Sequence, residues 1–87
     1  MYFAVNHDIE DKDLFAKSLA VYDEASMPAG YANPISYIAA DGSRAFCLWT
    51  GPSIEGLQPA LDAATTGAHN TYWAVDPKAE GTIGIPA

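Results

Sequence analysis

The stretch YANPISYIAADGSRAFCLW, residues 31–49, decides the fold, because it contains two apolar runs joined by a tight-turn signal. Its first half is rich in aromatic and β-branched side chains, although Pro34 weakens the start of this run as a strand. The sequence DGSR, residues 41–44, is a hairpin signal, because Asp-Gly tolerates the positive φ angles of tight turns. Residues 45–49, AFCLW, then return as the second strand. The sequence therefore predicts a β-hairpin in the middle of the chain.

A strand and a helix lie on each side of this hairpin, since the apolar pattern changes between strand and helix periods. Asp8 or Asp11 is predicted to cap the first helix and Ser53 the second. The remaining elements are predicted at residues 2–5 (strand), 13–26 (helix), 54–66 (helix) and 67–77 (strand). The order β-α-β-β-α-β is the ferredoxin-like order of an α+β protein. Right-handed crossovers then favour a four-stranded antiparallel sheet in the order 4-1-3-2, with two helices on one face.

Composition limits the domain count and the classes of partner. Eighty-seven residues suffice for a single domain, which we place at residues 1–77, followed by a C-terminal tail at 78–87. Four Lys and Arg against eleven Asp and Glu give a net charge of -7, which argues against nucleic acid and against an anionic membrane surface. Cys47 has no second cysteine to pair with, and neither a signal peptide nor a membrane-length apolar run is visible. We therefore expect a cytoplasmic protein.

Both faces of the predicted sheet are apolar. On the first strand, Phe3 and Val5 share one face while Tyr2 and Ala4 share the other. Two helices can cover only one of these faces, and large exposed apolar patches are uncommon on monomers. We therefore expect the second face to pack against another copy of the chain in a two-fold homodimer. The alternative is that the Tyr and Ala positions are simply tolerated at the surface.

The two histidines are predicted to meet at one edge of the sheet. His7 follows the first strand and His69 begins the last, and these strands are expected to be antiparallel neighbours. Pairing His7 with His69 also places Phe3 opposite Trp73, which favours this register. A slip of one residue would put the histidines on opposite faces.

Two site chemistries follow from this pairing. In the first, His7 and His69 hold a divalent metal with a nearby carboxylate. The carboxylates within reach are those of Asp8, Glu10 and Asp41. In the second, His69 with Tyr72 or Tyr37 is an acid–base pair for catalysis without a cofactor. The alternatives are structural: His69 caps a strand, His7 is solvated, and the tyrosines are core aromatics.

The aromatic residues also predict an apolar pocket for a small apolar or aromatic ligand. The side chains expected to line it are Phe3, Tyr37, Phe46, Trp49 and Trp73. The alternative is an ordinary core and dimer interface. Cys47 lies mid-strand between apolar residues, so we expect a buried, inert thiol.

The run FCLWTGPSIEGLQ, residues 46–58, resembles a passage in small bacterial ferredoxin-like proteins of the dimeric α+β barrel superfamily, one branch of which is described as nickel-binding. The matching residues are Cys47, Leu48, Pro52, Ser53, Glu55, Leu57 and Gln58. The resemblance implies a homodimer with its sheets face to face and a pocket between helices and sheet. The histidines of the nickel-binding branch fall near Leu61 and near Ser36 or Tyr37, so the match supports the fold and dimer more than nickel.

The function expected from these features is binding of a small molecule. The superfamily includes cofactor-free monooxygenases, polyketide cyclases and isomerases, so the resemblance implies an enzyme of this type, for which we take His69 as the acid–base residue. The alternatives are a nickel-binding protein that uses His7 and His69 and a non-catalytic assembly domain.

Overall fold

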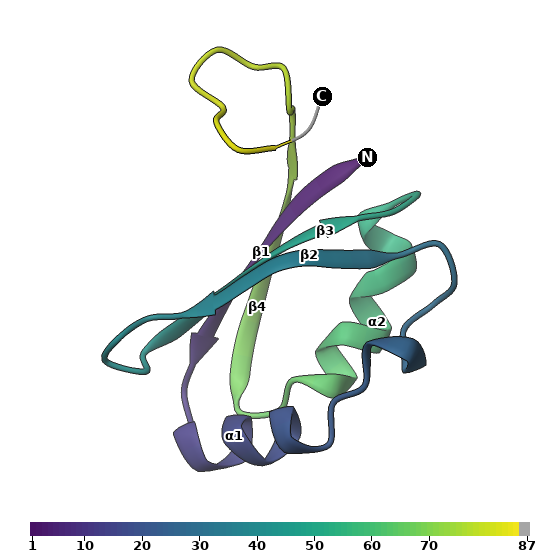
Figure 1. The fold of residues 1–87 in the computed structure, drawn as a ribbon. Coiled ribbons are helices and arrows are strands. Elements are labelled where there is room, and N and C mark those ends of the chain that lie inside the picture. Colours follow the sequence, from purple (N-terminus) through teal and green to yellow (C-terminus); the bar gives the residue numbers. More distant parts are fainter. Residues whose placement is uncertain (86–87) are drawn as a thin grey trace.

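The predicted ferredoxin-like α+β fold is confirmed by a computed structural model, which describes residues 1–85. Its four strands form one antiparallel sheet in the order β2-β3-β1-β4, and both helices lie on the same side of that sheet (Figure 1). The elements are β1 (Tyr2–Ile9), α1 (Lys12–Ala20), the 3-10 turn η1 (Glu24–Ser26), β2 (Ala32–Ile38), β3 (Arg44–Thr50), α2 (Ile54–Ala64) and β4 (Ala68–Val75). Among the described residues, no helix is long and apolar enough to cross a membrane.

The first strand is longer than predicted. We expected it to end at residue 5, but β1 continues to Ile9 through three polar residues. Asn6, His7 and Asp8 each pair with β3 on one side and with β4 on the other. A central strand hydrogen-bonds along both edges, and this pairing outweighs the low strand propensity of polar side chains. The extension brings His7 into the sheet instead of leaving it in a loop.

The first helix is shorter than predicted. The backbone N–H of Leu14 donates to the Asp11 carboxylate at 3.1 Å, so Asp11 is the N-cap, one of the two caps we considered. The helix ends at Ala20 instead of continuing to residue 26. The Asp23 carboxylate accepts from the backbone N–H of Ala25 at 3.0 Å and begins the separate turn η1. Aspartate favours such local capping over a helix interior, which explains the early end.

The hydrophobic core lies between the sheet and α2. Its fully buried side chains are Phe3, Val5, Trp49, Leu57 and Leu61. Burial of each such side chain stabilises the fold by about 1.5–3 kcal/mol. The helix that supplies the two leucines begins at the predicted cap, where the Ser53 hydroxyl accepts from the backbone N–H of Gly56 at 3.1 Å.

Helix α1 covers the sheet only partly. Phe15 is buried and its ring lies 6.0 Å from the imidazole of His7, whereas Leu14 and Leu19 remain 47% and 38% exposed. On the same side of the sheet, Ile38 of β2 is 53% exposed. The β2 edge is therefore left uncovered, and the space between this edge and the two helices is open to a ligand.

The predicted pairing of the two histidines is wrong by one residue. His7 lies opposite Asn70, and His69 lies opposite Asp8. Because side chains alternate along a strand, His7 faces the helices and His69 faces the other side of the sheet. The expected aromatic pair of Phe3 and Trp73 is also absent from the structure, where Phe3 lies opposite Ala74. The register instead places the amide of Asn70 beside the buried imidazole.

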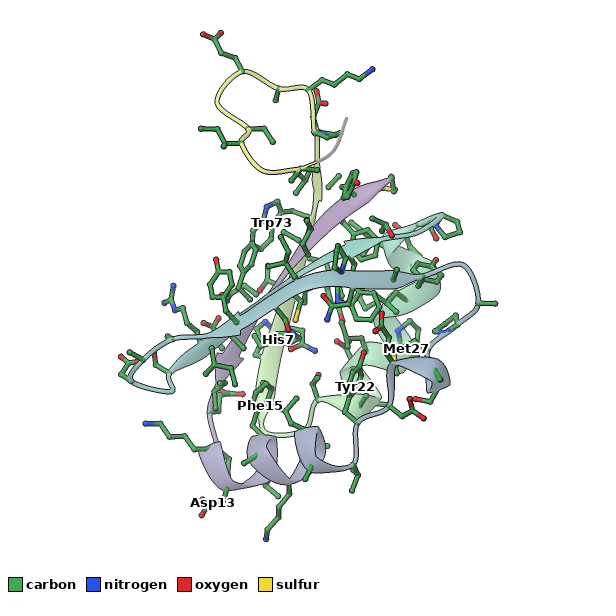
Figure 2. All side chains as sticks on the ribbon, in the orientation of Figure 1. His7, Asp13, Phe15, Tyr22, Met27 and Trp73 are labelled. Carbon is green, nitrogen blue, oxygen red and sulfur yellow. The ribbon has the colours of Figure 1, made fainter. Side chains whose placement is uncertain are left out.

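The other side of the sheet, which we call the open face, carries an aromatic row. The rings of Tyr37 and Phe46 are stacked at 5.4 Å, and Trp73 meets Phe46 edge-on at 5.9 Å. Figure 2 shows Trp73 on the opposite side of the sheet from His7. Tyr37 and Trp73 are 59% and 43% exposed, so this row gives the open face an exposed apolar surface.

The chain beyond β4 contains turns and neither helix nor strand in residues 76–85. The boundary that we predicted between a domain at 1–77 and a tail at 78–87 stays a prediction, and residues 86–87 lie outside the described part of the chain. In Figure 1 the tail extends past the end of β4 that is distant from α1. It therefore leaves the space between the helices and the sheet uncovered.

Candidate functional site

A cavity of about 440 Å³ lies between the sheet and the helices. Pockets for small molecules typically measure about 300–1,000 Å³, so its size suits such a ligand. The residues that line it include His7, Phe15, Tyr22, Ser36, Cys47, Trp49 and Leu61. Among the described residues, no Lys, Arg, Asp or Glu contributes to the lining. The cavity therefore favours an uncharged ligand with a largely apolar surface.

His7 is a buried polar residue of this cavity, with only 2% of its surface exposed. Its Nδ1 lies 2.5 Å from Oδ1 of Asn70, and its Nε2 lies 3.3 Å from Sγ of Cys47. Burial lowers the pKa of His7 below the usual 6.5, while the bond to Asn70 and the charge of Asp62 oppose this shift. The imidazole is therefore neutral near pH 7.

The neighbours of Asn70 determine which nitrogen of His7 carries the proton. Nδ2 of Asn70 donates to the Asp62 carboxylate at 2.9 Å and to the Thr65 hydroxyl at 2.8 Å. A carboxylate accepts hydrogen bonds and cannot donate them, so the amide nitrogen must face Asp62 and the amide oxygen must face His7. Nδ1 of His7 is then the donor, and its Nε2 carries a lone pair directed at the Cys47 thiol.

Cys47 is half-buried and has no disulfide partner. Burial raises the pKa of its thiol to about 11, with a hydrogen bond from Asn33 as a smaller opposing effect. The resting group is therefore a neutral thiol, whose S–H donates a hydrogen bond to Nε2 of His7. We expected a buried, inert thiol from the sequence, which did not anticipate its contact with a histidine.

Tyr72 is held by the same carboxylate as Asn70. Its hydroxyl donates to Oδ1 of Asp62 at 2.6 Å. Burial and then the Asp62 carboxylate raise the pKa of Tyr72 well above its usual value of 10.0, so the phenol remains protonated. Tyr72 faces the helix side whereas His69 faces the open side, so these two residues do not form one of the two acid–base pairs that we considered.

Two buried hydrogen-bond donors of the cavity lining have no partner among the described residues. They are the hydroxyl of Tyr22 and the indole N–H of Trp49, whose side chain is fully buried. A buried donor without an acceptor costs about 1–3 kcal/mol. Figure 2 shows Tyr22 on the same side of the sheet as His7 and Phe15. Either donor would be satisfied by an acceptor oxygen within hydrogen-bond distance.

The other predicted site residues are divided between the two faces. Tyr37, Phe46 and Trp73 line a depression on the open face, whereas Trp49 belongs to the helix side. Tyr37 also reaches the rim of the helix-side cavity. The predicted ligand-binding group is therefore not one site. The exposed His69 lies on the open face and does not line the cavity between the helices and the sheet.

The structure does not bring the predicted metal ligands together. His7 and His69 face opposite sides of the sheet, and both ring nitrogens of His7 contact protein atoms. Within residues 1–85, no three His, Cys, Asp or Glu side chains come close enough to hold a metal ion.

Asn70 and Asp62 were not identified from the sequence as site residues. Their roles depend on the β1–β4 register, because Asn70 reaches His7 only when the two residues are opposite each other. The usable signal was the alternation of strand residues, which places Asn70 and Tyr72 together on the face opposite Trp73.

Comparisons of the chain with models of protein families, with curated proteins and with solved structures find no match.

Proposed function

We propose that this protein binds a small, uncharged and largely apolar molecule that carries a hydrogen-bond acceptor. The proposed site is the cavity between the sheet and the helices. The observation that carries the proposal is the indole N–H of Trp49, a buried donor of the cavity lining that lacks an acceptor. A carbonyl or ether oxygen of a ligand would accept this hydrogen bond, and the apolar lining would contact the rest of the molecule.

Any acid–base chemistry in this cavity belongs to His7 instead of His69. His7 lines the cavity and presents the lone pair of Nε2 toward Cys47. A histidine whose tautomer is fixed by a second hydrogen bond is a suitable general base. This assignment retains the cofactor-free enzyme expected from the sequence and changes the residue that acts.

Binding can be measured with benzylacetone, an uncharged aromatic ketone. The Trp73→Phe variant leaves Trp49 as the sole tryptophan, so its fluorescence reports on the cavity. We expect saturable quenching, with an affinity in this variant equal to that of the original chain by calorimetry. Replacing Trp49 by Phe removes one hydrogen bond and should weaken calorimetric binding about two- to tenfold.

The matched control for occupancy is Ser36→Phe, which adds a bulky ring at an exposed position of the cavity lining. This change should abolish benzylacetone binding without disturbing the core. Equal affinity in the Ser36→Phe variant, or no saturable binding by the original chain, would contradict the proposed site.

We also propose that the chain forms a two-fold homodimer through the open face, in the arrangement of a dimeric α+β barrel. The support is the exposed aromatic row of Tyr37, Phe46 and Trp73. Extended apolar surfaces of this kind are typical of protein interfaces. Equilibrium sedimentation at micromolar concentration tests it, and a single species of 9.2 kDa would contradict it.

A further inference from the structure

We propose that Cys47 is a nucleophile that bonds covalently to a carbonyl-activated electrophile in the cavity, with His7 as its base and Asn70 as the positioning residue. This inference rests on the proposed binding function, because the electrophile must occupy the same cavity. It goes further by assigning a reaction to the lining.

The first support is the orientation of the proton relay. Sγ of Cys47 lies 3.3 Å from Nε2 of His7, and Oδ1 of Asn70 holds the opposite nitrogen of the ring. The bond from Asn70 to the Asp62 carboxylate fixes the amide direction and thus leaves Nε2 free to accept the thiol proton. A nucleophile, a base and a residue that orients the base are the three parts of an activated-thiol site.

The second support is the access of a ligand to the thiol. Both Cys47 and His7 line the cavity, so a bound molecule can approach the sulfur from the same space that holds it. No charged side chain within the described residues lines that space, and the thiol is therefore kept neutral until the proton moves to His7. The imidazolium formed in that step is stabilised by the Asn70 oxygen and by the charge of Asp62.

The third support is the pair of unpartnered donors. The indole N–H of Trp49 and the hydroxyl of Tyr22 both belong to the cavity lining. Trp49 lies two positions after Cys47 on β3 and faces the same side of the sheet. Donors that are already positioned stabilise negative charge as it develops on a carbonyl oxygen. These two donors would therefore stabilise the negative charge on the carbonyl oxygen of the electrophile.

For an enone, the proposed step is an addition without any other reactant. The thiol proton moves to Nε2 of His7, and the sulfur of Cys47 bonds to the β-carbon as the carbon–carbon double bond opens. The electron pair moves to the carbonyl oxygen and forms an enolate that Trp49 and Tyr22 can hydrogen-bond. The proton on Nε2 then passes to the α-carbon. The S–H group has been added across the double bond, and no oxidant or leaving group is needed.

The experiment compares benzylideneacetone, an aromatic enone, with its saturated analogue benzylacetone. Intact-protein mass and peptide mapping measure adduct formation at Cys47, while calorimetry measures reversible binding of benzylacetone. We expect a saturable adduct rate for the original chain and for Trp73→Phe on the open face. Cys47→Ser should bind benzylacetone and form no adduct.

Substitutions of His7 and Asn70 test whether these residues assist the reaction of Cys47 or only stabilise the fold. His7→Gln should lower the adduct rate about 10²-fold or more, the scale of general-base catalysis, while benzylacetone binding is retained. Asn70→Leu should lower it similarly, and the exchange of Asn70→Asp with Asp62→Asn, which keeps an acceptor for Nδ1 and a donor–acceptor pair between positions 62 and 70, should restore at least part of the rate. Circular dichroism establishes that each variant is folded before its rate is compared.

Three outcomes would overturn the inference. These are an adduct rate linear in enone concentration, a rate equal to that of the unfolded chain, and a rate unchanged in folded His7→Gln. If benzylacetone binds while any of these is observed, the covalent step fails and the binding function stands. If benzylacetone does not bind, the binding function itself fails.

Discussion

Replacement of Asn70 by Leu is expected to destabilise the fold strongly, because it removes the acceptor from a buried imidazole. Nδ1 of His7 donates to Asn70 at 2.5 Å, and His7 is only 2% exposed. An unpaired buried donor costs about 1–3 kcal/mol. The bonds from Asn70 to Asp62 and Thr65 add little, because Asp62 is exposed and the Thr65 hydroxyl retains its bond to the Leu61 carbonyl.

The pair can be tested with a double-mutant cycle. His7→Leu alone leaves the half-buried oxygen of Asn70 without its donor, at a cost of about 1–2 kcal/mol. Removing both polar partners together leaves neither group unpaired, so His7→Leu with Asn70→Leu should cost less than the sum of the single changes by about 1–3 kcal/mol. The total stability of a small domain is about 5–15 kcal/mol, so a difference of this size is measurable.

Urea unfolding followed by circular dichroism provides these free energies. All four chains are compared at one protein concentration, because dimerisation would make stability depend on concentration. A pH of about 8 keeps histidine neutral in the unfolded chain as well. Single changes whose costs simply add would refute the reasoning, since they would mean that the two side chains do not depend on each other.

Gly56→Ala should destabilise the fold by about 1–3 kcal/mol in thermal melts, although this change usually stabilises a helix, because the new methyl group collides with the Tyr31 hydroxyl. Tyr31→Phe removes that hydroxyl, so the same change should be better tolerated there. Stability should fall as pH drops below 6.5, because the lowered pKa of His7 means that the unfolded chain binds its proton more readily. In the His7→Leu variant, the free energy of unfolding should depend less on pH below 6.5. The same pH dependence in this variant and in the original chain would contradict the role given to His7. Trp73→Lys should convert the proposed homodimer to monomer in sedimentation.

The sequence predicted the fold better than it predicted the site. Two strong local signals, the Asp41–Gly42 turn and the Ser53 cap, fixed the element order from which the sheet order follows. The register between β1 and β4 has no such signal, because these strands are joined through the whole fold and not by a turn. An aromatic pairing of Phe3 with Trp73 favoured one register, but the structure adopts the next.

That single step accounts for most of the site residues that the prediction missed. With the register set one residue away, His7 approaches Asn70 instead of His69. The division of the aromatic residues between two faces has a different cause, because Phe46 and Trp49 lie three residues apart on β3 and so face opposite sides in any register. A hydrogen bond between side chains of two different elements, such as the bond from Asn70 of β4 to Asp62 of α2, requires the two residues to be close in space. The periodicity of the sequence does not specify such contacts. The position of Cys47 mid-strand was correctly predicted, but its neighbours were not.

Asp62 has a consequence for how this sequence can diverge. One carboxylate oxygen receives both the amide of Asn70 and the hydroxyl of Tyr72, and thereby joins α2 to β4. A substitution that removes the Asp62 carboxylate deprives both the Asn70 amide and the Tyr72 hydroxyl of this acceptor. A substitution of Asn70 or Tyr72 alone removes only one of the two hydrogen bonds to Asp62. Positions 62, 70 and 72 should therefore change together in related chains, and a drift of Asp62 to an apolar residue should be accompanied by loss of both donors.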